Sequence, residues 1–146
     1  PKIGNLRSAT AGAEGGCQAE VGSASAMAAS AAVELFGGTP RQCMDAASFA
    51  MVNILGLVCD PIGGLVENPC QNRNAMGASN ALISAELSLA GVKSITPIDE
   101  TIGVMYAVGR SIPSELRETS LGGMAVAKSA CENCMACANK RNKMKK

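Results

Sequence analysis

The residues of this sequence best suited to chemistry are its cysteines, because seven are present and histidine is absent. Cys59 and Cys70 bracket the proline- and glycine-containing stretch CDPIGGLVENPC, and Cys17 follows the run GAEGG. A free cysteine in a core acts as a small hydrophobe and needs no such surroundings, whereas thiolates bind metals and act as nucleophiles. An odd number of cysteines leaves one thiol over from any complete set of disulfides. We therefore expect a reducing, cytoplasmic setting in which thiols serve metals or catalysis.

Helix signals recur along the chain without an alternating strand pattern. Gly37 and Gly38 end a first helix, and Thr39-Pro40 supplies the cap and first-turn proline of a second. Thr96-Pro97 repeats this signal, and the proline after Asp60 disfavours helix at that residue. We therefore predict an all-α fold, a bundle of about four to five helices with a site at one end where helix termini converge. The predicted helices span 18–36, 40–58, 71–90 and 97–109, with one or two further turns within 111–120.

These helices are expected to bring three cysteines to the same end of the bundle. The first two are nearly equal in length and are joined by the short turn GGTP, so they pack antiparallel and return Cys59 close to Cys17. Cys70 opens the third helix after a loop of ten residues and can lie at that end. Cys43, in the first turn of the second helix, lies ~24 Å along the axis from Cys59. We predict that Cys17, Cys59 and Cys70 converge without Cys43.

Three converging thiolates favour one kind of inorganic group. Cys17 and Cys70 begin helices, where backbone N–H groups and the positive helix end are expected to lower the pKa of a thiol. A structural zinc site usually closes with four ligands, and no fourth ligand is evident here. A [4Fe–4S] cluster held at three corners leaves one iron open to act on a substrate. The alternative is three buried structural cysteines beside ordinary turn glycines.

The three cysteines stand within distinctive stretches, SATAGAEGGCQAEVGSASAMAA and GLVCDPIGGLVENPCQNRNAMGASNA, and a third stretch, LRETSLGGMAV, follows. Together these closely resemble the C-terminal half of the α domain of bacterial iron–sulfur L-serine dehydratases, over about residues 8–126. The resemblance implies that Cys17, Cys59 and Cys70 ligate a [4Fe–4S] cluster. It also implies a lyase that dehydrates and deaminates L-serine to pyruvate and ammonia without pyridoxal phosphate, the open iron binding the substrate's hydroxyl and carboxylate.

The resemblance extends to a cysteine near the C-terminus, which in some family members binds the cluster as a fourth ligand. Cys131 is its closest equivalent, although CENCMACANK departs from the pattern by adding Cys134 and Cys137. We divide the chain into a cluster-binding portion, 1–127, and a cysteine-rich basic tail, 128–146, expected to be mobile. Alternatively, the tail is the metal clip of a non-catalytic, cysteine-based metal-binding or redox module, or a solvated segment with reactive thiols.

Substrate contacts are expected just after Cys70. Arg73 and Asn74 follow it, and the planar guanidinium of Arg73 suits a substrate carboxylate. The alternative for Arg73 is an ordinary surface position in the first turn of a helix. Asp60 and Glu67 are expected to cap helices or to brace the loop.

The general base and several partners are expected elsewhere. Glu14 and Glu20 flank Cys17, and without histidine the base has to be a carboxylate, a lysine or a group on another segment. The first half of the family's α domain and its β domain lie outside this sequence, so they are expected partners beside L-serine. A half-domain exposes an apolar face, and we therefore expect a homo-oligomer.

Composition argues against two other classes of partner. The formal net charge is only +1, with most of the excess in KRNKMKK, so a nucleic-acid partner is not expected. The longest nearly uncharged stretch, 46–59, has 14 residues, fewer than the ~20 that span a membrane. Met27, Met51, Met76 and Met105 are expected to fill the core. A helical interaction domain with inert cysteines is the remaining alternative.

Overall fold

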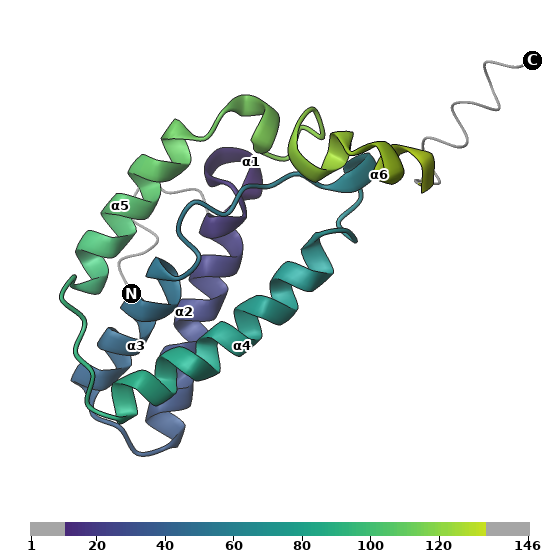
Figure 1. The fold of residues 1–146 in the computed structure, drawn as a ribbon. Helices are drawn as coiled ribbons and strands as arrows, with labels where there is room; N and C mark the ends of the chain where they lie inside the picture. Colours follow the sequence, from purple (N-terminus) through teal and green to yellow (C-terminus); the bar gives the residue numbers. More distant parts are fainter. Residues whose placement is uncertain (1–10, 134–146) are drawn as a thin grey trace, which may run out of the picture.

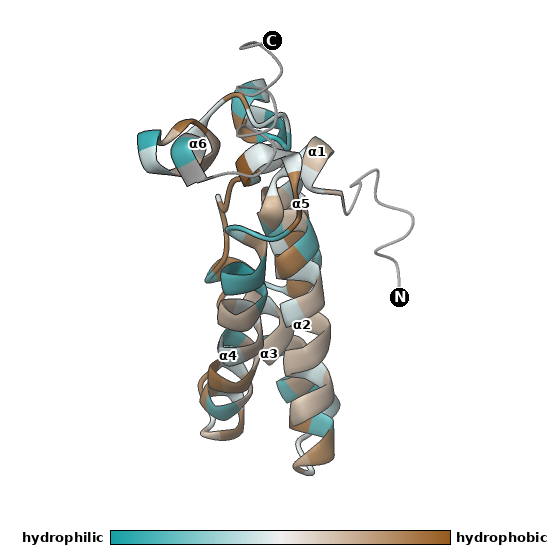
Figure 2. Ribbon diagram, turned by 90° about the vertical axis from the view of Figure 1, so that its right-hand side faces the viewer, coloured by the Kyte–Doolittle hydropathy of each residue, from teal (hydrophilic) through white to brown (hydrophobic). Residues whose placement is uncertain are grey.

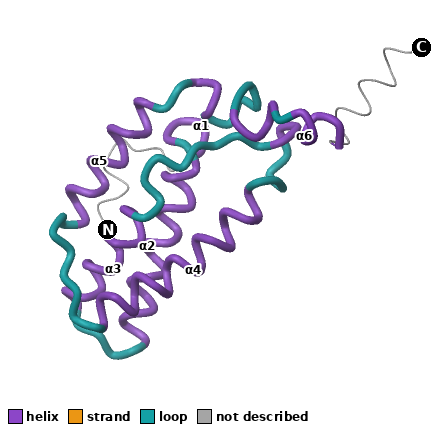
Figure 3. The backbone as a smooth tube through the Cα atoms, in the orientation of Figure 1, coloured by secondary structure: helices purple, strands orange, loops and turns teal. Residues whose placement is uncertain are grey.

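The computed structural model describes residues 11–133, and in this part of the chain every regular element is helical (Figure 3). An isolated bridge between Cys59 and Arg117 is the strand-like pairing recorded there. The predicted all-α bundle is therefore confirmed. The α-helices are α1 Gly12–Gly15, α2 Cys17–Leu35, α3 Pro40–Val52, α4 Cys70–Leu89, α5 Ile98–Ser111 and α6 Lys128–Asn133, and the 3-10 turns are η2 Ile62–Gly64, η3 Ser114–Leu116 and η4 Gly123–Val126.

The hairpin of α2 and α3 forms as its local signals predict, but its second arm is shorter. Thr39 caps α3 in a reciprocal capping box with Gln42. The helix then ends at Val52 instead of Val58, so the prediction of two equal helices is wrong. The cause lies on α2, where the Gln18 side chain accepts a hydrogen bond of 2.8 Å from the Gly56 amide. This contact holds the chain in a turn where a helix would continue.

Helix α2 is the central element of the bundle. It packs along α3 and α4 and also contacts α1 and α5. Figure 2 shows α2, α3 and α4 standing side by side, with α1 and α6 gathered at one end. In Figure 1 the same end carries the start of α2, the start of α4 and the loop that precedes α4. The topology thus brings distant segments together at one end.

Small residues let these helices approach closely. The main core is built largely from alanines, with Val33, Met51, Ile102 and Met105 as its larger members. A Cβ atom on Gly77 of α4 would lie 2.7 Å from Val21 Cγ1 of α2. At this crossing the Ser25 hydroxyl donates to the Gly77 carbonyl at 2.8 Å. Close packing therefore requires a glycine here and satisfies a buried polar group at the same point.

A second buried polar contact joins three helices. Asn80 of α4 donates through Nδ2 to Ser25 Oγ of α2 at 2.9 Å and to the Ala50 carbonyl of α3 at 2.8 Å. Its Oδ1 accepts from Asn53 Nδ2 at 2.8 Å. Satisfied networks of this kind fix the register of neighbouring helices. The ends of α2 and α4 are thereby held in a defined relation.

The methionine prediction is only half right. Met51 and Met105 are buried in the core, whereas Met27 and Met76 are exposed. The reason is that α2 and α4 carry apolar residues around much of their circumference, so not every apolar position can face the core. Within residues 11–133, no helix combines the length and apolar character that crossing a membrane requires.

Candidate metal centre

Cys17, Cys59 and Cys70 line one small cavity of about 60 Å³. Each is less than one-tenth exposed, and none of them is in a disulfide. Cys17 is the first residue of α2 and Cys70 the first residue of α4, while Cys59 comes from the loop after α3. Cys43, by contrast, packs against the main core. The predicted convergence of three thiols without Cys43 is therefore found.

Cys59 reaches this cavity by a different route from the predicted one. It does not end a helix. Instead its amide donates to the Leu116 carbonyl at 2.8 Å, and its carbonyl accepts from the Glu118 amide at 2.6 Å. The segment LRET, far along the chain, therefore positions the second thiol.

Two glycines allow the backbone to approach Cys59 and the residues just before it. Gly16 precedes α2 with a φ of 75°, a left-handed conformation, and a Cβ there would lie 2.8 Å from the Leu57 carbonyl. Gly12 of α1 faces the thiol itself, because a Cβ there would lie 2.8 Å from Cys59 Sγ. The run GAEGG thus gives the sulfur atom room.

A Gly12→Ala substitution is expected to destabilise the chain by about 1–3 kcal/mol, because the added methyl group overlaps Cys59 Sγ and forces a shift of backbone or thiol. Gly22→Ala in α2 is the matched control, since its Cβ would meet nothing within 4 Å. That change is expected to stabilise the chain by up to about 1 kcal/mol through helix propensity. Urea denaturation measures both. Equal effects of the two substitutions would contradict the assigned contact.

A buried ion pair braces the cavity. Arg73 Nη1 donates to Asp60 Oδ1 at 2.6 Å and to the Val58 carbonyl at 2.8 Å, and it lies 3.9 Å from Cys17 Sγ. The Asp60 side chain is only 3% exposed, and its Oδ2 accepts from the Met124 amide at 2.6 Å. The expectation that Asp60 braces the loop is confirmed. The roles of Arg73 and Asn74 in substrate binding stay predictions.

Two of the three thiols, those of Cys59 and Cys70, have raised pKa values. Burial raises the pKa of the Cys59 thiol, and the neighbouring Cys17 and Glu118 raise it further. Burial also raises the pKa of the Cys70 thiol. Cys17 raises this pKa further, and the positive charge of Arg73 partly offsets the rise. The expected lowering of the pKa at a helix start is therefore wrong for Cys70, since loss of water outweighs the backbone hydrogen bond. Binding a metal group to these thiols releases protons.

The chemistry of the three thiols fits the donor set of an iron–sulfur cluster. In the described part of the chain, no group of three or more His, Cys, Asp or Glu side chains is arranged to hold a metal ion. A single metal ion binds all of its ligands directly, whereas each thiolate of a [4Fe–4S] cluster binds a different iron atom. Three buried thiols line this one cavity.

Only one of the three C-terminal cysteines lies among the described residues. The backbone of Cys131 lies in α6, whereas Cys134 and Cys137 lie outside the described residues. α6 packs against η4 and η2, and η2 belongs to the loop between Cys59 and Cys70. The tail therefore begins at the thiol end of the bundle. Its ligand role and the division of the chain after residue 127 stay predictions.

Sequence reasoning missed two residues, one beside this site and one in it. Gln18, 1% exposed, joins α2 to Gly56 and to the Met105 carbonyl of α5. Glu118 lines the thiol cavity in a left-handed conformation with a φ of 65°. A positive φ in a non-glycine residue is uncommon and occurs preferentially at functional sites. Neither contact has a local sequence signal, although Glu118 stands in the stretch LRETSLGGMAV.

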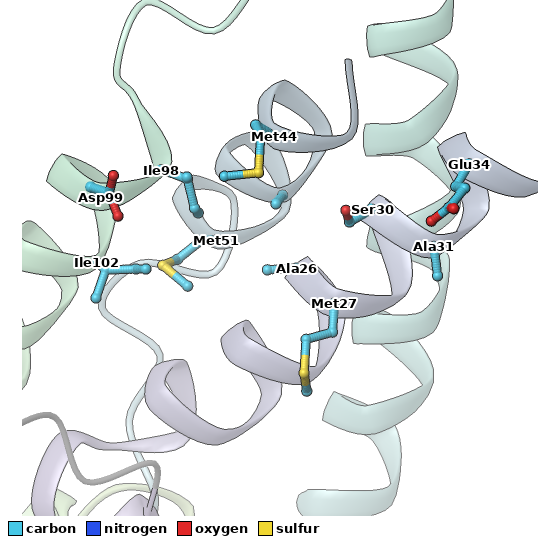
Figure 4. A pocket seen from close by; sticks show the side chains of 11 residues that line it. Ala26, Met27, Ser30, Ala31, Glu34, Met44, Met51, Ile98, Asp99 and Ile102 are labelled. Carbon is cyan, nitrogen blue, oxygen red and sulfur yellow. The ribbon is translucent and has the colours of Figure 1, made fainter. Parts of the chain in front are cut away.

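A larger cavity of about 350 Å³ lies away from the cysteines, between α2, α3 and α5. Figure 4 shows Met27, Met44 and Met51 around it, with Glu34 and Asp99 at its margins. Its lining is mainly apolar and offers few groups for a small polar substrate. The thiol cavity remains the candidate site.

Comparison with known proteins places this site in a family. The model of the serine dehydratase alpha chain family matches residues 5–125. The chain is 60% identical over 114 residues to the "Probable L-serine dehydratase, alpha chain" of Bacillus subtilis, covering 78% of this chain and 38% of that protein. It is 62% identical over 118 residues to the "L-serine dehydratase, alpha chain" of Peptoniphilus asaccharolyticus, covering 81% of this chain and 40% of that protein.

A third relative, less similar to this chain, is named without a chain designation. The "L-serine dehydratase" of Mycobacterium tuberculosis is 48% identical over 129 residues, covering 85% of this chain and 28% of that protein. The chain thus spans less than half the length of these relatives. The range matched by the family model, residues 5–125, contains all three cavity cysteines. The chain belongs to the serine dehydratase alpha chain family.

Proposed function

We propose that this chain is the cluster-binding part of an iron–sulfur L-serine dehydratase, a lyase that converts L-serine to pyruvate and ammonia. The observation that carries this proposal is the meeting of three buried cysteines, from two helix starts and one loop, around one cavity. The names of the relatives support the choice of substrate and reaction.

In this proposal Cys17, Cys59 and Cys70 hold a [4Fe–4S] cluster, and pyridoxal phosphate is not required. When bound, the cluster supplies a Lewis acid for departure of the substrate hydroxyl, which is a poor leaving group unaided. Val21 and Pro61 line the same cavity and are buried, so they exclude water from the thiols. Charges in such a site interact more strongly than charges in water.

Residues of α4 complete the proposed site. Asn74 lines the thiol cavity, and its Nδ2 donates to the Cys70 carbonyl at 3.0 Å. Arg73 Nη1 is engaged by Asp60, so a substrate carboxylate would use its other N–H groups. Cys131 is proposed as a further ligand, supported by the packing of α6 against the loop that joins Cys59 and Cys70.

We further propose that activity belongs to a cytoplasmic assembly of this chain with the remaining α segment and a β chain or domain. The relatives named as alpha chains support a β partner, and all the relatives are longer than this chain. Apolar side chains exposed on several helices, among them Leu82 and Ile83 of α4, support further association, including self-association.

Anaerobic reconstitution of the assembled enzyme with iron and sulfide tests the proposal. We expect equal amounts of bound iron and sulfide, a broad visible absorption, and pyruvate formation from L-serine. Truncation after residue 126 is expected to leave a cluster in place, because the three cavity cysteines remain. Loss of all metal on truncation would instead support a redox module in the tail. Tight binding of one zinc ion without iron would overturn the proposal.

A further inference from the structure

Two carboxylates line both the thiol cavity and a second, adjoining cavity. Glu20 and Glu118 line the thiol cavity, and both also line an adjoining cavity of about 470 Å³. The second cavity is more open and is bounded otherwise by α1 and α2. A molecule in it would therefore lie beside the proposed cluster ligands, within reach of both carboxylates.

Both carboxylates are available to a ligand. No ion pair of either is recorded among residues 11–133, and both residues are exposed. Glu118 is held in its left-handed conformation by the hydrogen bond from its amide to the Cys59 carbonyl. Such a conformation is strained in a non-glycine residue, and residues held in it cluster at functional sites.

A buried hydroxyl in the same cavity lacks a partner. Ser23 lines the adjoining cavity of about 470 Å³, one helical turn after Glu20, and the residue is 6% exposed. Its Oγ is buried and makes no hydrogen bond within the described part of the chain. Leaving a buried polar group unsatisfied is costly, so the site is short of one polar partner.

We propose that Glu20, Glu118 and Ser23 form a subsite for the α-ammonium group of a small amino acid, placing it beside the three thiols. The inference rests on the proposed function and names the part of the substrate that this chain recognises. An ammonium group donates three hydrogen bonds, which matches two carboxylates and one hydroxyl. An anionic group would be repelled by the two carboxylates, and Arg73, the cation beside Cys17, is already paired with Asp60.

The test uses the assembled, cluster-loaded enzyme and compares L-serine with L-glycerate, which carries a hydroxyl in place of the ammonium group. Binding of each is followed by the change in cluster absorption, and KM and kcat are measured for L-serine. In Glu118→Gln and Glu20→Gln we expect the affinity for L-serine to fall about 10- to 100-fold, as for loss of a charge-assisted hydrogen bond. Glycerate binding should change little. Glu86→Gln, an exposed carboxylate of α4, is the matched control.

The outcomes separate this inference from the proposed function. An unsubstituted enzyme without a cluster or without pyruvate formation would overturn the proposed function. An active enzyme whose glutamine variants keep the preference for serine over glycerate would overturn only the ammonium subsite. If Glu118→Gln loses its cluster, Glu20→Gln and Ser23→Ala decide, and an unchanged preference in both overturns the inference.

Discussion

Replacing Cys59 by serine is expected to reduce cluster occupancy by at least about tenfold, which is the largest effect on metal binding that we predict. Iron–sulfur clusters bind soft thiolates, and a serine hydroxyl is a harder ligand that ionises far less readily. Two remaining thiols, Cys17 and Cys70, would leave a second corner of the cluster without a protein ligand. Iron and sulfide analysis with visible absorption, after anaerobic reconstitution, measures the loss.

Cys43→Ser is the matched control for this experiment. Cys43 is also a free cysteine within the bundle, but it packs against the main core and does not line the thiol cavity. The same atom is exchanged, so any general cost of placing a hydroxyl in the interior applies to both variants. Circular dichroism should show the helices of both. Equal cluster loss in the two variants would contradict the assignment of Cys59 as a ligand.

The start of each helix that carries one of the three cavity cysteines could be predicted from local sequence. Cys17 follows a glycine run and Cys70 follows a proline, and both are first residues of their helices in the structure. The GGTP turn with its capping box likewise gave the hairpin. These features depend on neighbours a few residues away, which is why single-sequence reasoning finds them.

The route of Cys59 could not be predicted in the same way. The stretch MVNILGLV reads as a continued helix, and its interruption depends on Gln18, which lies on another helix. The pairing of Cys59 with Leu116 and Glu118 joins segments that are far apart in sequence. The convergence of the three thiols was predicted, although the predicted position of Cys59 at a helix end was wrong. The prediction held because the short hairpin alone already returns the chain to that end of the bundle.

Replacing Arg73 by alanine is expected to destabilise the metal-free chain by about 3 kcal/mol, the largest effect on stability that we predict. The arginine side chain is 15% exposed and that of Asp60 3% exposed, so the substitution leaves a carboxylate buried without its cation. Arg110→Ala, at an exposed position in the last turn of α5, is the control, with an expected change of about 0.5 kcal/mol or less. Thermal or urea unfolding of the 146-residue chain measures both.

The size of this effect separates two roles of Arg73. A residue used only to bind the substrate carboxylate would raise KM for L-serine and leave the unfolding free energy nearly unchanged. A brace would lower stability before any ligand is present, because Asp60 links the Arg73 guanidinium of α4 to the Met124 amide after α5. Since the same guanidinium lies 3.9 Å from Cys17 Sγ, a brace also positions a proposed ligand, so Arg73→Ala should weaken cluster retention together with the fold.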